Sequence, residues 1–176
     1  RPDIFRVGVV RDAGGGVAYQ RQMAESIGMD AAVVYYHPQA VLAGSPWLER
    51  YPLVRTYHSV DPAAVLRLNG DRRRACLSGA LGSAYPFRCR LAGDARRLGI
   101  DVLPHPGRDP MVPRTPAYLE ALASYKVSVA TASRFGFALR KILESVVAGC
   151  VTITDLPAYD DLPVIEWEAI KNLRFK

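Results

Sequence analysis

Short β-branched runs alternate with amphipathic helical patterns along most of this chain of 176 residues. An apolar run over 4–10 is followed by a glycine-rich turn at 12–16, a helical pattern over 17–27 and a second apolar run over 31–36. A strand, a helix and a strand in that order form a βαβ unit whose strands are parallel. The alternation therefore predicts an α/β fold, a Rossmann-like parallel sheet with helices on both faces.

The second half of the chain repeats this alternation more regularly. Strands are predicted at 74–78, 100–103, 126–132 and 151–154, and helices at 86–98, 117–125 and 137–148. The intervening segment 37–62 is rich in proline and is predicted to be irregular. We expect a partial Rossmann-like half with an interdomain segment over residues 1–61, and a nearly complete Rossmann-like domain over residues 62–176.

Two comparable halves do not fit in a chain of this length, because each would need the size of an ordinary domain. We therefore expect a truncated chain, a sequence with missing stretches, or a minimised relative of a larger protein. The chain contains no run of the roughly 20 apolar residues that a membrane-spanning helix needs. Three widely spaced cysteines, Cys76, Cys89 and Cys150, are expected to be reduced core thiols of a cytoplasmic protein.

The net charge of +6 favours an anionic partner, whether a nucleotide, a nucleic acid or a membrane surface. The excess lies partly in the run 72–74 and in the group Arg88, Arg90, Arg96 and Arg97. A solvated basic face is the plainer interpretation of any one of these side chains. Histidines and acidic residues are scattered in the sequence, so neither a metal site nor a nucleophilic triad is predicted.

Three loops of the second half follow strands, at the edge where open parallel sheets bind ligands. The first is 78–84, which contains two glycines and precedes a helix start at Tyr85-Pro86. The others are 104–108 and 133–136, and the last leads directly into the amphipathic pattern over 137–148. Glycines let backbone amides approach a phosphate, and helix N-termini attract anions, so these loops predict a phosphate-binding edge.

Polar residues in the helix predicted over 137–148 allow two interpretations. Lys141 could neutralise a diphosphate together with Arg134, and Glu144 could accept hydrogen bonds from a ribose. Spacing alone equally favours a surface ion pair between Lys141 and Glu144, which are three residues apart. The glycines at 14–16 are likewise open to two interpretations, a loop facing a ligand cleft or a plain tight turn.

Several short motifs resemble the signature of GT-B glycosyltransferases. The resemblance begins with Ser133-Arg134-Phe135-Gly136-Phe137, continues with Leu143-Glu144 and ends with Ala148-Gly149-Cys150-Val151. Three further motifs, Ser78-Gly79-Ala80, Tyr85-Pro86-Phe87-Arg88 and His105-Pro106-Gly107, resemble the glycosyl transferases group 1 family, in its branch of spore-maturation-type proteins. The resemblance covers about residues 57–156, mainly the C-terminal nucleotide-sugar-binding domain of that family.

The resemblance implies an enzyme that moves a sugar from a nucleotide-diphosphate sugar to an acceptor hydroxyl without a metal ion or other cofactor. It implies that Glu144 holds the ribose and that Arg88 and Lys141 neutralise the diphosphate. The complete set of nucleotide-sugar-binding residues expected on this basis is Ser78, Gly79, Arg88, His105, Ser133, Arg134, Lys141 and Glu144. The base, the sugar, the acceptor, the anomeric outcome and the catalytic residues are not specified by the motifs.

One position departs from the family pattern. Many retaining enzymes of this kind carry a glutamate eight residues before the ribose glutamate, and this chain has Gly136 there. The departure favours an alternative, a nucleotide- or sugar-binding protein of the same fold that does not catalyse transfer. A basic nucleic-acid-binding module is a weaker alternative, because exposed aromatic residues do not interleave with the arginines.

Overall fold

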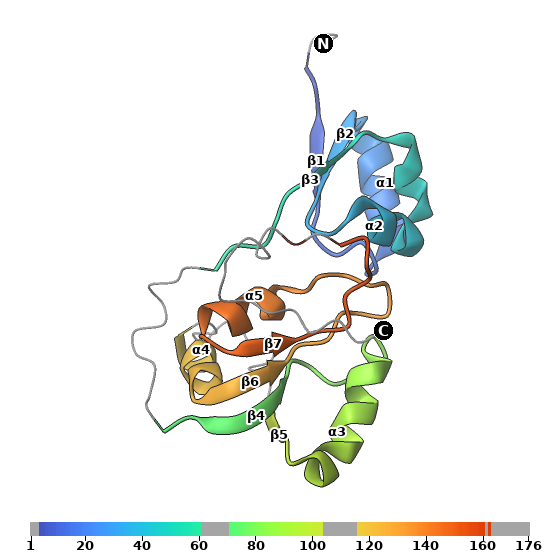
Figure 1. Cartoon of the computed structure of the whole chain (residues 1–176). Helices are drawn as coiled ribbons and strands as arrows, with labels where there is room; N and C mark the ends of the chain where they lie inside the picture. The colour runs from blue at the N-terminus through green and yellow to red at the C-terminus, as the bar shows by residue number, and fades with distance from the viewer. Residues whose placement is uncertain (1–3, 61–70, 104–115, 161, 163–176) are drawn as a thin grey trace. The chain divides into compact units, whose positions relative to one another are not determined.

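The computed structural model describes residues 4–60, 71–103, 116–160 and 162. The chain divides into two compact units, Arg1–His58 and Ser59–Lys176, close to the boundary expected after residue 61. Both units are built from parallel strands flanked by helices (Figure 1). The predicted α/β class with a Rossmann-like parallel sheet is confirmed.

The first unit contains a three-stranded parallel sheet in the order β1-β2-β3. Its elements are β1 (Val7–Val10), α1 (Val17–Ile27), β2 (Ala31–Val34), α2 (Pro38–Gly44), the 3-10 helix η1 (Pro46–Arg50) and β3 (Leu53–Arg55). Helix α1 agrees with the predicted range because Gly28 ends it in the left-handed conformation, at φ 61°.

The prediction of an irregular segment over 37–62 is wrong for residues 38–55, which form α2, η1 and β3. Two prolines of this segment start helices. Pro38 and Pro46 occupy the first helical positions, where a missing N–H costs nothing, and His37 Nδ1 accepts a hydrogen bond from Gln39 N at 3.3 Å. These elements are too short to show a hydrophobic period. The prolines were therefore the strongest signal in the segment, and they indicated irregular structure.

Local hydrogen bonds account for the glycine-rich turn at 12–16. Gln20 Nε2 donates to Asp12 O at 2.8 Å and to Gly15 O at 2.6 Å. Gly16 takes φ 61° at the start of α1, a conformation that suits glycine. The turn is therefore fixed by the first turns of the helix that it introduces.

The second unit contains a four-stranded parallel sheet in the order β5-β4-β6-β7. Its elements are β4 (Arg73–Ser78), α3 (Pro86–Leu98), β5 (Asp101–Leu103), α4 (Pro116–Ala123), β6 (Tyr125–Val129), α5 (Arg140–Val147) and β7 (Val151–Ile153). Helix α3 packs against β4 and β5, whereas α4 and α5 contact each other and pack on β6 and β7 (Figure 1).

This strand order creates a topological switch point between β4 and β6. The chain leaves β4 through α3 toward β5 on one side, and leaves β6 through α5 toward β7 on the other. The helices that follow these two neighbouring strands, α3 and α5, therefore lie on opposite faces of the sheet. Open α/β sheets bind ligands in the crevice at such a point.

The core of the second unit lies between the sheet and α4. Its fully buried members include Cys76, Leu119 and Leu122, and Cys150 is nearly as buried. All three cysteines are free thiols, but Cys89 is exposed, so the expectation of a core position is wrong for that residue. Within the described ranges, no helix combines the length and apolar character required to cross a membrane.

Candidate functional site

The loops after β4 and β6 lie against each other at the switch point. Arg134 N, in the loop after β6, donates to Ala84 O, in the loop after β4, at 3.0 Å. Arg88, in the first turn of α3, donates from Nη1 to Ala80 O at 2.6 Å and from Nη2 to Thr131 O at 2.8 Å. The structure thus brings together two of the three loops in which the sequence placed phosphate-binding residues.

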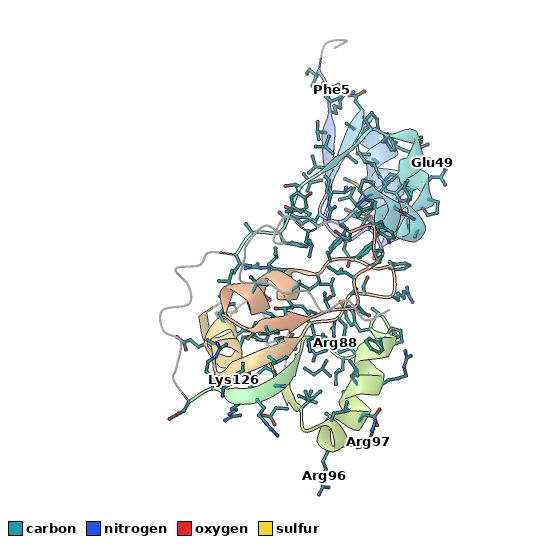
Figure 2. All side chains as sticks on the ribbon, viewed as in Figure 1. Phe5, Glu49, Arg88, Arg96, Arg97 and Lys126 are labelled. Carbon is teal, nitrogen blue, oxygen red and sulfur yellow. The ribbon has the colours of Figure 1, made fainter. Side chains whose placement is uncertain are left out.

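Arg88 connects these loops from inside the protein. Its side chain has no exposed surface, and Nε donates to Thr131 Oγ1 at 3.0 Å in addition to the two carbonyl contacts. The guanidinium also lies over the Tyr85 ring at 4.2 Å. Figure 2 shows Arg88 between α3 and the sheet, whereas Arg96 and Arg97 extend from the far end of the helix. Arg88 therefore holds the loops in place, and its bonds within the protein do not show the diphosphate contact that the resemblance implies.

Lys141, in the first turn of α5, is the other buried cation of the switch point. Only 8% of its surface is exposed. Its side chain crosses the turn after β4: a Cβ at Gly79 would lie 2.4 Å from Nζ and 2.6 Å from Cε of Lys141. Gly79 has φ 105°, which few other residues adopt. The absence of a side chain at Gly79 therefore creates the space that Lys141 occupies.

The Lys141 ammonium has no hydrogen bond or ion pair with any residue that the structure describes. Its Nζ lies 5.2 Å from the centre of the Tyr85 ring. Burial, and to a smaller extent the Arg88 charge, lower the pKa of Lys141 to about 7, whereas Glu144 opposes both effects. An ammonium on a largely buried side chain, with no acceptor among the described residues, is poorly solvated, and an anion placed beside it would reduce that penalty.

Glu144 lies one turn after Lys141 but pairs with a different residue. Its Oε1 forms an ion pair with Arg140 Nε at 3.1 Å, with 15% of the Glu144 side chain exposed. The surface ion pair between Lys141 and Glu144 that spacing allowed is therefore not formed. Burial raises the pKa of Glu144, whereas Arg140 and Lys141 lower it. The second carboxylate oxygen has no partner among the described residues.

The turn containing Ser133 uses its own amides. Ser133 Oγ accepts from Phe135 N and Phe137 N, each at 3.3 Å, and Ser133 O accepts from Gly136 N at 2.9 Å. Arg134 is exposed, and its guanidinium lies 4.7 Å from the Phe135 ring centre. These amides are already engaged, so the phosphate contact expected from them is not available in this structure.

The same turn explains a shift in the helix that follows it. The helix predicted over 137–148 begins at Arg140. Phe137 and Ala138, predicted as its first residues, are buried instead in extended connecting chain. The helix start therefore lies closer to Lys141 than the sequence indicated.

A row of buried hydroxyls joins α5 to the sheet. Ser145 Oγ donates to Ser128 Oγ at 2.8 Å, and Ser128 Oγ donates to Ser78 Oγ at 3.1 Å. Ser78 Oγ in turn lies 3.4 Å from Val129 O. Ser78, predicted to bind the nucleotide sugar, thus participates in holding α5 on the sheet. Ser128 and Ser145 belong to none of the motifs, although serine within an apolar run is a recognisable signal of a buried polar contact.

Gly136 adopts a conformation that excludes the glutamate of the family pattern. Its φ is 75°, and a Cβ there would lie 2.7 Å from Pro157 Cγ and 3.1 Å from the Tyr159 hydroxyl oxygen. Any side chain at this position would strain the backbone and collide with Pro157. The departure from the family pattern is therefore built into the packing of this turn.

The remaining predicted residue, His105, lies outside the described residues. Two residues that the motifs did not single out complete the switch point: Thr131, which accepts from Arg88, and Asp155, whose Oδ1 accepts from Ala132 N at 2.6 Å. In the part of the chain that the structure describes, no three His, Cys, Asp or Glu side chains cluster as metal ligands would. No protein-family model, curated protein or solved structure matches this chain.

Proposed function

We propose that the second unit binds the diphosphate of a nucleotide sugar beside Lys141, and that the protein transfers the sugar to an acceptor hydroxyl. The observation that carries the proposal is the Lys141 ammonium, which is buried over Gly79 and lacks a hydrogen-bond partner among the described residues. It lies beside the switch point of a parallel sheet, where ligands of such sheets bind. A phosphate oxygen supplies the acceptor that this ammonium lacks.

In glycosyl transfer, the bond between the anomeric carbon and a diphosphate oxygen breaks, and its electron pair stays on the diphosphate. A cation next to that oxygen stabilises the developing charge. Lys141, whose pKa is lowered to about 7, becomes more fully protonated when a diphosphate binds, because a neighbouring negative charge favours the ammonium form. Arg88 contributes by fixing the two loops and adds its own buried positive charge.

Glu144 is the residue that we assign to the ribose. Arg140 engages one carboxylate oxygen and thereby fixes the orientation of the side chain. The other oxygen is then placed to accept a hydrogen bond from a sugar hydroxyl. This assignment rests on the resemblance to the glycosyl transferases group 1 family and on the position of Glu144 one turn after Lys141.

The test is a calorimetric titration of the full chain with UDP, GDP and inorganic pyrophosphate. Saturable binding is expected, and Lys141→Met should weaken it by about 10- to 100-fold, the range for losing one charged hydrogen bond of roughly 1.5–3 kcal/mol. Lys126→Met is the matched control, since Lys126 is an exposed lysine of the same sheet (Figure 2). Equal affinities of the two variants would disprove the role of Lys141.

Gly136 favours a second candidate, a nucleotide-sugar-binding protein of the same fold that does not catalyse transfer. The conformation of Gly136 excludes the glutamate through which many retaining relatives contact the donor sugar. Release of free nucleoside diphosphate from a nucleotide sugar, with and without added acceptors, separates the two candidates. Binding without release would favour the second.

Nucleic-acid binding receives less support from the arginines, because several of them are engaged within the protein. Arg72 donates to the backbone carbonyls of Gly149, at 2.9 Å, and of Ala148, at 3.2 Å. Arg73 contacts the Tyr125 hydroxyl at 3.1 Å. Titration with single-stranded DNA at two salt concentrations tests this alternative, since phosphate-dominated binding weakens steeply with salt.

A further inference from the structure

The first strand of the first unit is an open edge. In the sheet order β1-β2-β3, β1 has a neighbour on one side only, within the residues that the structure describes. The side chains of Val7 and Val9 are exposed on one sheet face, by 50% and 57%. The strand itself contains no charged residue and no proline. Natural proteins usually protect such an edge with charged residues or proline, because it readily pairs with another strand.

The hydrogen-bond pattern of β1 shows which backbone groups are available. Ala31 N donates to Arg6 O at 3.3 Å, so the even-numbered residues of this strand direct their N–H and C=O groups toward β2. In a parallel pair the odd-numbered residues then direct theirs the other way. Val7 and Val9 therefore present two N–H groups and two carbonyls at the open edge.

An exposed apolar stripe on α1 runs beside this edge. Tyr19, Met23 and Ile27, spaced four residues apart, are exposed by 67%, 44% and 44%. Together with residues 8–12 they line a groove of about 420 Å³. A helix that covers a sheet normally buries such a stripe, so both the strand and the helix lack a neighbour on the same side.

We propose that this side of the first unit binds a second copy of the chain, with β1 pairing antiparallel to β1 of that copy. A two-fold axis perpendicular to the sheet pairs a strand with its own copy and satisfies both edges at once. The same axis places the two α1 helices on one face, with Met23 near its counterpart and Tyr19 near Ile27 of the other copy. One symmetric contact thus covers both the β1 edge and the α1 stripe of each copy. A single strand from a different protein would cover the edge but not the stripe.

Backbone geometry limits the register of this pairing. Directly opposite residues of an antiparallel pair must both point their backbone groups toward the partner, or both away. This condition is met whenever the numbers of two opposite residues add to an even number. Among these registers, the one with Gly8 opposite Gly8 of the second copy centres the contact on β1 and places each Val7 opposite a Val9. In that register Arg6 faces a valine and Arg11 faces Phe5, so no two like charges are opposed.

The first test is the oligomeric state of the full chain, measured by sedimentation over a wide dilution series. A concentration-dependent dimer is expected, and Val9→Lys should raise its dissociation constant by about 2- to 30-fold, because it replaces both cross-strand Val7–Val9 pairs of the dimer. Val54→Lys is the matched control. Val54 lies on β3, at the opposite edge of the sheet, and it is 55% exposed. It lies in the same cross-strand row as Val9, with Val33 of β2 between them.

Two results would overturn the proposal. One is a chain that stays monomeric throughout the dilution series. The other is equal weakening by Val9→Lys and Val54→Lys, which would mean that the copies associate through the sheet face instead of the β1 edge.

Cross-linking tests the register independently. Cys89, the exposed cysteine, is first replaced by serine. The Val7→Cys chain, the Val9→Cys chain and an equal mixture of the two are then oxidised in three separate samples. Hydrogen-bonded antiparallel partners have Cα atoms about 5.5 Å apart, within disulfide range. A disulfide dimer is expected in the mixture alone, whereas cross-linking of Val7→Cys with itself would contradict the register.

Discussion

Lys141 is held in an environment that disfavours its charge, and this has consequences that can be measured without any ligand. The side chain is buried, Arg88 lies nearby and Tyr85 offers only its ring face. Among the described residues, the charged groups that act on the Lys141 ammonium are Arg88 and Glu144. The phenol of Tyr118 lies close to Glu144 and to Ser78. A residue retained at such a cost is typical of a binding site, where function opposes stability.

We expect Lys141→Met to stabilise the empty protein, most strongly at low pH. The folded pKa of Lys141 is about 7 against 10.5 for a free lysine, so the unfolded chain binds more protons between these values and stability rises with pH there. The destabilisation is complete below about pH 7, on the order of a few kcal/mol, and falls by about half by pH 9. Urea unfolding at pH 6 and pH 9 measures the difference between variant and wild type. A variant that is less stable than wild type at pH 6 would refute the burial penalty.

At the scale of elements, the turn after β4 shows how a loop can shape a binding site without contributing a side chain. Gly79 and Gly82 lie in this one turn, but they differ in what surrounds them. A Cβ at Gly79 would meet the end of Lys141, whereas a Cβ at Gly82 would meet nothing within 4 Å. Gly79 also has a positive φ, and Gly82 does not.

The two glycines therefore predict opposite outcomes for the same substitution. Gly79→Ala should destabilise the second unit by about 1 kcal/mol or more through backbone strain, and it should displace Lys141 and weaken pyrophosphate binding. Gly82→Ala, where space and φ permit a methyl group, should leave binding unchanged. Thermal unfolding and calorimetric titration of both variants give the comparison. Equal affinity for pyrophosphate in the two variants would show that binding does not depend on the position of Lys141 over Gly79.

Elements differ in how well the sequence predicts them, and the reasons are physical. Helices α1 and α3 match their predicted ranges because a left-handed glycine ends each one, at Gly28 and Gly99. The start of α5 was placed too early because the Ser133 hydroxyl binds the amides of the preceding turn, a local competitor that hydrophobic spacing does not reveal. Helix boundaries of this kind depend on side-chain to backbone bonds.

The candidate site was predictable in its position but not in the roles of its residues. Parallel strands and glycine-containing loops were sufficient to place Gly79 and Lys141 at one edge of the sheet. The clamp made by Arg88 depends on carbonyls of Ala80 and Thr131, which belong to distant parts of the chain. Because a motif records residue identity and spacing only, it does not distinguish an arginine that binds ligand from one that binds backbone.

At the scale of the whole molecule, the two units are distinct in contacts and in the roles that we propose for them. The proposed diphosphate site involves β4, β6 and α5 of the second unit, and the proposed self-association surface involves β1 and α1 of the first. Each unit has its own sheet and its own buried residues. Perturbing one of these surfaces is therefore expected to leave the other functional, which allows Val9→Lys to be studied for nucleotide binding as a monomer.

Hydrogen exchange of the full chain tests this division directly. A ligand at 100 times its dissociation constant stabilises the state that it binds by about 2.7 kcal/mol, which corresponds to roughly a hundredfold slower exchange of amides that open with the site. With saturating UDP, amides of β4, β6 and α5 should slow by up to this factor, whereas those of β1, β2 and β3 should keep their rates. Dilution of the protein without ligand should have the reverse effect, raising exchange at Val7 and Val9 and leaving β4 and β6 unchanged. Slowing of both sheets by UDP to the same extent would show that the two units unfold as one, and that stability gained at the Lys141 site is shared by the β1 edge.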